Sequence, residues 1–155
     1  MISFSLITEI QAPLEFVTRL FEDRSQLPHW QHGFISDEKI KDGKEGMQYK
    51  LVYRAGNRNI TLTETIIRSE LPAHYDVVLR MKGMKNIVQN SFSANGTNTT
   101  LWEVQHTFRF RWLMMLIGPG MKKGLEKQSE MLMQHFKAFA EREYERMRGM
   151  RDMRL

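Results

Sequence analysis

The chain contains no cysteine among its 155 residues. This absence excludes disulfide bonds, thiol nucleophiles and thiolate metal sites together. No apolar run approaches the roughly 20 residues that a membrane-spanning helix needs. The first ten residues carry Glu9 and lack a basic start, which is unlike a secretory leader. We therefore expect a cytoplasmic protein without a membrane span.

The sequence also lacks the short motifs that mark common catalytic and metal sites. There is no Gly-x-Ser-x-Gly nucleophile elbow, no glycine-rich phosphate loop and no His-Glu-x-x-His pair. His29 and His32 would be neighbours on a helix, but Gly33 follows directly and is expected to end it. We expect no metal site and no cofactor.

The composition is typical of a globular domain. Apolar residues make up 41% of the chain and charged residues 26%, and the length fits a single domain over residues 1–155. The net charge is +5, but the arginines beyond position 141 alternate with Glu and Asp. Mixed signs at helical spacing are typical of a solvated helix face, so we interpret 142–155 as an exposed helix end and expect no nucleic-acid partner.

The apolar residues follow two different spacings along the chain, one typical of strands and one typical of helices. Alternation of apolar and polar residues predicts strands over 2–10, 34–40, 47–54, 60–66, 74–82, 88–92 and 102–109. Pro13 and the apolar residues after it predict one short helix, and residues 23–30 a second. From Met121 the period becomes helical, with a predicted inward stripe of Leu125, Gln128, Leu132, His135, Phe136 and Phe139. We predict an α+β fold in which the long sheet wraps the final helix and encloses a cavity.

The turns also predict which residues face each other across the strands. If each hairpin closes at its Gly, Asn or Pro turn, the alternation sets the partners to within two residues. One predicted row is Tyr49, Glu64, Leu79, Val88 and His106, a parallel row is Ile66, Val77, Asn90 and Val104, and Phe92 lies opposite Trp102.

Glu64 is the unusual residue of the predicted inner face, because its neighbours there are Leu62 and Ile66. A buried carboxylate needs a hydrogen-bond partner or a raised pKa, and Tyr49 is the expected partner. Two interpretations stay open: a structural Tyr–Glu bond at the pocket mouth, or a group that moves protons or orients a polar ligand atom.

His106 is the second candidate for acid–base chemistry. Three strand steps separate it from Glu64, so the two side chains should lie roughly 14 Å apart and not bond directly. The alternative is an inward histidine that is hydrogen-bonded within the core. Asn90 is a further inward polar group that could bind a ligand atom.

The whole chain resembles the SRPBCC superfamily, the START and polyketide cyclase-like helix-grip proteins. The resemblance rests on the opening strand, Ala12-Pro13, Leu27-Pro28-His29-Trp30, the Thr63-Glu64-Thr65-Ile66 strand with Leu71-Pro72, the hairpin from Asn95-Gly96 to Trp102, and the closing helix after Pro119. It implies a seven-stranded antiparallel sheet that grips the C-terminal helix over an apolar cavity, with two short helices after the first strand. The implied pocket positions are Tyr49, Leu51, Glu64, Leu79, Asn90, Trp102, His106, Met121, Leu125, Gln128 and Leu132.

Members of this superfamily bind lipids, sterols, polyketides, plant hormones or quinones, and a minority catalyse cyclisation or dehydration. We accordingly expect a soluble binding protein for a small hydrophobic or aromatic molecule. The alternative is a cyclase or dehydratase that uses Glu64 or His106 as acid or base. A third possibility is a partner-binding module that forms a homodimer. The apolar run 112–117, followed by Gly118-Pro119-Gly120, is either a lid at a cavity mouth or a buried connector.

Overall fold

The computed structural model describes residues 1–43, 46–111 and 120–154, so the run 112–117 lies outside the described residues. The strands are β1 (Ile2–Ile10), β2 (Phe34–Gly43), β3 (Gly46–Ala55), β4 (Arg58–Glu70), β5 (His74–Met81), β6 (Met84–Ala94) and β7 (Thr100–Phe110). The helices are α1 (Leu14–Glu22), the short 3-10 turn η1 (Arg24–Gln26), α2 (Leu27–Trp30) and α3 (Met121–Met153).

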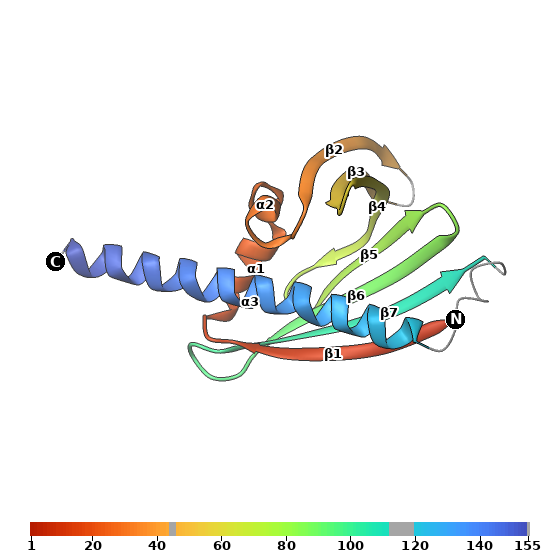
Figure 1. The fold of residues 1–155 in the computed structure, drawn as a ribbon. Coiled ribbons are helices and arrows are strands. Elements are labelled where there is room, and N and C mark those ends of the chain that lie inside the picture. Colours follow the sequence, from red (N-terminus) through yellow and green to blue (C-terminus); the bar gives the residue numbers. More distant parts are fainter. Residues whose placement is uncertain (44–45, 112–119, 155) are drawn as a thin grey trace.

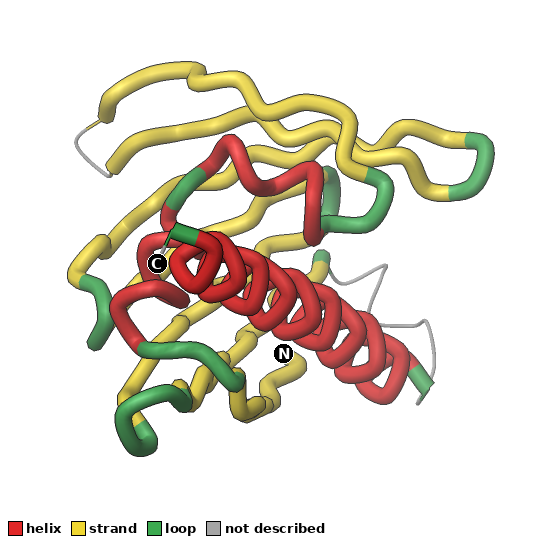
Figure 2. Tube along the Cα trace, turned by 90° about the vertical axis from the view of Figure 1, so that its left-hand side faces the viewer, coloured by secondary structure: helices red, strands yellow, loops and turns green. Residues whose placement is uncertain are grey.

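The seven strands form one antiparallel sheet in the order β1-β7-β6-β5-β4-β3-β2. The sheet curves around α3, which crosses its inner face, while α1 and α2 lie at one end of the sheet (Figures 1 and 2). This arrangement confirms the predicted helix-grip fold, including the two short helices after the first strand.

An aromatic core joins these elements at the end of the sheet where α1 and α2 lie. The ring of Phe136 on α3 lies within 5.5 Å, centroid to centroid, of the rings of Phe21, Trp30 and Trp102. Phe136 is fully buried and Trp102 nearly so. Buried rings of this size supply much of the apolar area that stabilises a domain, so this end of the inner face is filled by the protein itself.

Gly33 lies between the end of α2 and the start of β2. Its φ of +78° is in the left-handed region, and a Cβ there would collide with the carbonyl oxygen of Arg54 on β3. The Arg54 amide also donates to the Gly33 carbonyl at 2.6 Å. Only glycine allows this close approach, which places the start of β2 against β3.

The predicted register is confirmed for the β3–β4, β4–β5 and β6–β7 pairs, and the partners between β5 and β6 are displaced by two residues. Tyr49 faces Glu64, Glu64 faces Leu79, and Val88 faces His106, as expected. Leu79, however, faces Asn86, and Val88 faces Val77. The cause is the tight turn at Lys82-Gly83, which pairs Met81 with Met84 and shifts the predicted partners by two residues.

The inward face of α3 also differs from the predicted stripe. The buried residues are Ser129, Met133, Phe136, Phe139 and Ala140, whereas Gln128 and His135 are exposed. The helical period of apolar residues predicts only apolar inward positions, so it misses Ser129. A serine can occupy an inward position when it has a buried hydrogen-bond partner. Gln128 therefore does not face the sheet.

Candidate functional site

The inner face of the sheet is covered unevenly. Beside the aromatic core its side chains are buried, but towards the β5–β6 turn Leu62, Leu79, Met84 and Phe110 stay partly exposed. On α3 the partly exposed apolar residues include Met121, Leu125 and Leu132. We call the four sheet residues Leu62, Leu79, Met84 and Phe110 the open end of the inner face.

A charged cluster lies beside the open end, around Arg24 of η1. The guanidinium donates from Nε and Nη2 to the two carboxylate oxygens of Asp37, both at 2.8 Å, and from Nη1 to Oε1 of Glu64 at 2.7 Å. It also lies over the Tyr49 ring, 3.6 Å from the centroid. One arginine thus binds β2 and β4 together and covers a ring of β3.

The predicted Tyr49–Glu64 bond is wrong, although the two residues face each other. The Tyr49 hydroxyl has a weak contact of 4.0 Å with the sulfur of Met47, and Glu64 accepts from Arg24 instead. Sequence reasoning missed Arg24 because it lies in a short 3-10 turn, where no periodicity predicts the direction of a side chain. The only local signal is Asp23, whose carboxylate accepts from the Ser25 amide and caps that turn.

Burial dominates the electrostatics of this cluster. It raises the pKa of Glu64, and the charge and hydrogen bond of Arg24 offset part of that rise. Burial acts to lower the pKa of Arg24, but the two carboxylates outweigh it and raise that pKa above its ordinary value. Burial, with the nearby charge of Glu64, also raises the pKa of Tyr53 and Tyr75. The cluster therefore holds a permanent cation between two carboxyl groups, and the Oε2 atom of Glu64 makes no hydrogen bond within the described part of the chain.

A second polar group connects the sheet to α3 through His106. Its Nδ1 lies 3.1 Å from Asn86 Nδ2, and its Nε2 lies 2.7 Å from Ser129 Oγ. Burial lowers the pKa of His106 to about 4, so the ring is neutral at pH 7. The Asn86 amide nitrogen donates to Nδ1, so the ring proton is on Nε2, which donates to Ser129 Oγ. Asn86 is only 3% exposed, and its Oδ1 has no hydrogen-bond partner among the described residues.

Other predicted pocket residues lie in the core. Asn90 accepts from Trp102 Nε1 at 3.0 Å and donates to the Tyr75 carbonyl at 3.0 Å, so its amide is occupied by the protein. Leu51 is buried as well. The structure thus brings Glu64 and Tyr49 beside Leu79 at the open end, and separates Asn90, Trp102 and Leu51 from it.

The described residues contain neither a metal-binding cluster nor a membrane-spanning helix. No three His, Asp or Glu side chains there gather closely enough to hold a metal ion. None of the helices described is both long and apolar enough to cross a membrane.

Comparison with known proteins identifies the fold. No protein-family model matches the chain, and no curated protein matches it in sequence. Among solved structures, a START superfamily protein from Mycobacterium smegmatis is 18% identical, with a TM-score of 0.74 over 92% of this chain and 99% of that one. The ZhuI aromatase/cyclase of a Streptomyces species is 12% identical, with a TM-score of 0.71 over 90% and 93%. The di-domain aromatase/cyclase StfQ of the steffimycin pathway is 13% identical, with a TM-score of 0.73 over 93% of this chain and 46% of that one. The chain therefore has the helix-grip fold shared by START-like proteins and polyketide aromatase/cyclases.

Proposed function

We propose that the protein binds a small hydrophobic or aromatic molecule, of lipid, polyketide or quinone type, between the open end of the inner face and α3. The observation that supports this is the uneven covering of the sheet: apolar side chains stay partly exposed next to buried polar groups. Contiguous exposed apolar surface of this kind commonly marks a binding site. A ligand that covers about 300 Å² of it would gain roughly 7 kcal/mol, before the cost of immobilisation.

Polar atoms on both sides of Leu79 would orient such a ligand. Glu64, Leu79 and Asn86 lie in one cross-strand row, so Glu64 and Asn86 are two strand spacings, about 10 Å, apart. Each contributes an acceptor without a hydrogen bond in the described structure, Oε2 of Glu64 and Oδ1 of Asn86. A ligand hydroxyl or N–H group would supply the donor, which favours a molecule with a polar group near one end.

The second candidate is a cyclase or dehydratase in which Glu64 or His106 moves protons. The names of two structural neighbours support it, since both are aromatase/cyclases. The local geometry favours binding instead. Arg24 holds Glu64 in an ion pair, and both ring nitrogens of His106 are hydrogen-bonded to the protein. A general acid or base needs an atom that is free to exchange its proton with substrate, so His106 does not fit, and at Glu64 only Oε2 is free within the described structure while Oε1 is bound to a fixed cation.

The test compares ligand affinity in two tryptophan variants. Native mass spectrometry and organic extraction of the purified protein come first, to identify any bound molecule. Affinity for that molecule, or for the neutral dye Nile red, is then measured in Leu79→Trp, which fills the open end, and in Ile7→Trp, which lies exposed on the other face of β1. We expect at least tenfold weaker binding in the first variant only. Equal affinity in both variants would contradict the proposal.

A further inference from the structure

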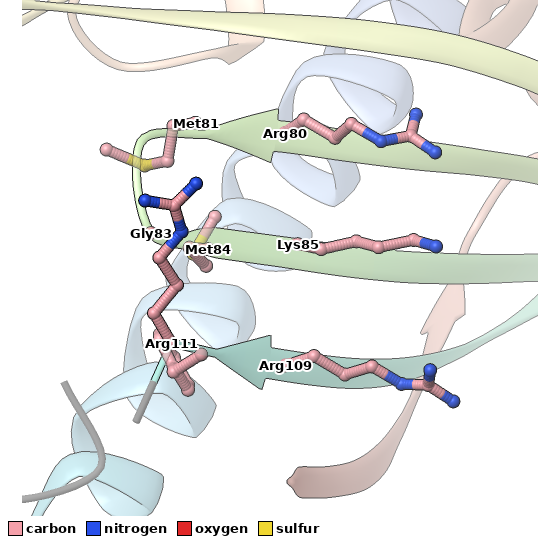
Figure 3. Close-up of a pocket in the computed structure, with 8 residues that line it drawn as sticks. Arg80, Met81, Gly83, Met84, Lys85, Arg109 and Arg111 are labelled. Atoms are coloured by element: carbon pink, nitrogen blue, oxygen red, sulfur yellow. The ribbon is translucent and has the colours of Figure 1, made fainter. Parts of the chain in front are cut away.

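Three cations lie in a row on the outer face of the sheet, the face turned away from α3. Arg80 of β5 is directly opposite Lys85 of β6, and Lys85 is directly opposite Arg109 of β7. Figure 3 shows the three side chains side by side and pointing the same way. We call Arg80, Lys85 and Arg109 the basic row.

The basic row works against the stability of the sheet. Like charges directly opposite each other on neighbouring strands are destabilising. Within the described ranges none of the three forms an ion pair, and the only side-chain hydrogen bond is a long one of 3.4 Å from Arg80 to Thr65. Thr63 faces both Arg80 and Lys50, which places a fourth cation in the same line. Folding alone gives no reason for this arrangement.

The positive charge of the whole chain is concentrated in this part of the sequence. Residues 77–125 contain seven Lys or Arg and a single acid, Glu103, which gives +6, more than the net +5 of the chain. Lys82 and Arg111 lie at the turn beside the basic row, and α3 begins at the same end of the molecule (Figure 1). A hollow of about 340 Å³ lies there, lined by Arg80, Met81, Gly83, Met84, Lys85, Arg109, Phe110 and Arg111.

The side chains around the basic row indicate which anionic partner fits. A sheet that binds single-stranded nucleic acid presents aromatic rings for the bases to stack on. The alternation places every Phe, Tyr and Trp of β3 to β7 on the inner face, so the outer face of these strands has none. Met81, by contrast, is 37% exposed at the turn end of the basic row, where it is opposite Met84 and lines the same hollow as the cations. Cations around an exposed apolar side chain match the boundary between anionic headgroups and acyl chains.

We propose that this end of the protein docks on a membrane surface rich in anionic lipids, with the basic row contacting lipid phosphates. Each Lys or Arg near such a surface strengthens binding by roughly fivefold, so the three together account for more than tenfold. Added salt screens the attraction, because Arg80 and Arg109 are exposed and Lys85 is partly exposed. This docking is independent of the proposed ligand and requires no molecule at the open end.

The test is sedimentation of the full chain with phosphatidylglycerol-containing vesicles and with pure phosphatidylcholine vesicles. The variant Arg80→Gln/Lys85→Gln/Arg109→Gln is compared with Arg142→Gln/Arg151→Gln/Arg154→Gln, which removes the same charge from exposed positions of α3 and its end. Wild type and the α3 variant should sediment with the anionic vesicles at low salt, and the basic-row variant should bind them at least tenfold more weakly. Removing the repulsion should leave its thermal stability equal to or above that of wild type.

Three results would overturn the proposal. One is equal vesicle binding by wild type and the basic-row variant. Another is an equal loss in the α3 variant, which would mean that net charge alone attracts the protein. The third is binding to a single-stranded RNA, but not to vesicles, that depends on the basic row, since this would assign the surface to nucleic acid. A Leu79→Trp variant that no longer binds Nile red but still binds vesicles would show that this surface acts independently of the ligand site.

Discussion

Arg24 and Glu64 are joined by a 2.7 Å hydrogen-bonded ion pair, although 40 positions separate them in the sequence. The pair connects the 3-10 turn after α1 to an inward carboxylate of β4, and Arg24 holds Asp37 of β2 at the same time. One side chain therefore fixes the position of the short helices relative to two strands.

Removing Arg24 should strongly destabilise the protein. The Arg24→Met variant leaves two largely buried carboxylates without their cation, and breaking such a pair costs about 3 kcal/mol. Arg19→Met serves as the matched control, because Arg19 pairs with Glu15 in full solvent exposure and should cost under about 1 kcal/mol. Urea unfolding of both variants gives the two values. Similar losses would mean that the cluster adds no more than a surface pair.

Stability should fall as the pH drops from about 6.5 to about 4, because of His106. Its pKa in the folded protein is lowered to about 4, so in this range the unfolded chain binds a proton that the folded protein does not. The full effect of this difference is about 3 kcal/mol, present above pH 6.5 and lost on acidification. Urea unfolding at both ends of the range measures it. His106→Gln should flatten the dependence, and His135→Gln, at an exposed position, should not.

Ser129 and Gln128 provide a direct test of which side of α3 faces the sheet. Ser129→Ala removes the partner of His106 Nε2 in a buried site, which should cost about 2 kcal/mol in the free energy of unfolding. Gln128→Ala, one position earlier and exposed, should change it by less than about 0.5 kcal/mol. Thermal or urea unfolding distinguishes the two. The reverse order would restore the stripe predicted from the sequence.

Alanine substitutions at Gly33 and Gly56 distinguish the cost of a strained backbone from the cost of a steric collision. Both have positive φ, but a Cβ at Gly56 meets no atom within 4 Å, whereas at Gly33 it meets the Arg54 carbonyl. Gly56→Ala should therefore cost about 1 kcal/mol from strain alone. Gly33→Ala should cost at least about twice as much, since β2 must also move away from β3. Equal losses in urea unfolding would show that the close approach relaxes freely.

The sequence allowed the fold to be predicted because alternation is a local signal. Strands, their inward faces and the long helix all follow from the period of apolar residues, and most pairings follow from the turns. The prediction was wrong at two places, one set by the length of a turn and the other by a non-local contact. The tight Lys82-Gly83 turn shifts the β5–β6 register, and a hydrogen bond to His106 makes Ser129 an inward residue.

The candidate site was harder to predict than the fold. The alternation along β4 identified Glu64 as an inward carboxylate but did not predict its hydrogen-bond partner. That partner, Arg24, lies in a turn that has no periodicity. Asn86 bonds to His106 and has an oxygen without a hydrogen-bond partner in the described part of the chain; it was missed because the register error placed Val88 opposite Leu79. The basic row was also missed, because alternation places its cations on the outer face, where charged residues are typical of an ordinary solvated surface.

The pairing of β1 with β7 has a consequence for the order in which the protein can assemble during synthesis. Ser3 and His106, which share a hydrogen bond, are 103 positions apart, so β1 is synthesised before the other strands of this sheet but pairs only with the last of them, β7. Its apolar side chains stay uncovered in the meantime, and closing so long a loop slows folding. The nascent chain therefore completes its sheet only after Phe110 has emerged, and a chaperone that shields residues 2–10 until then would raise the yield of folded protein.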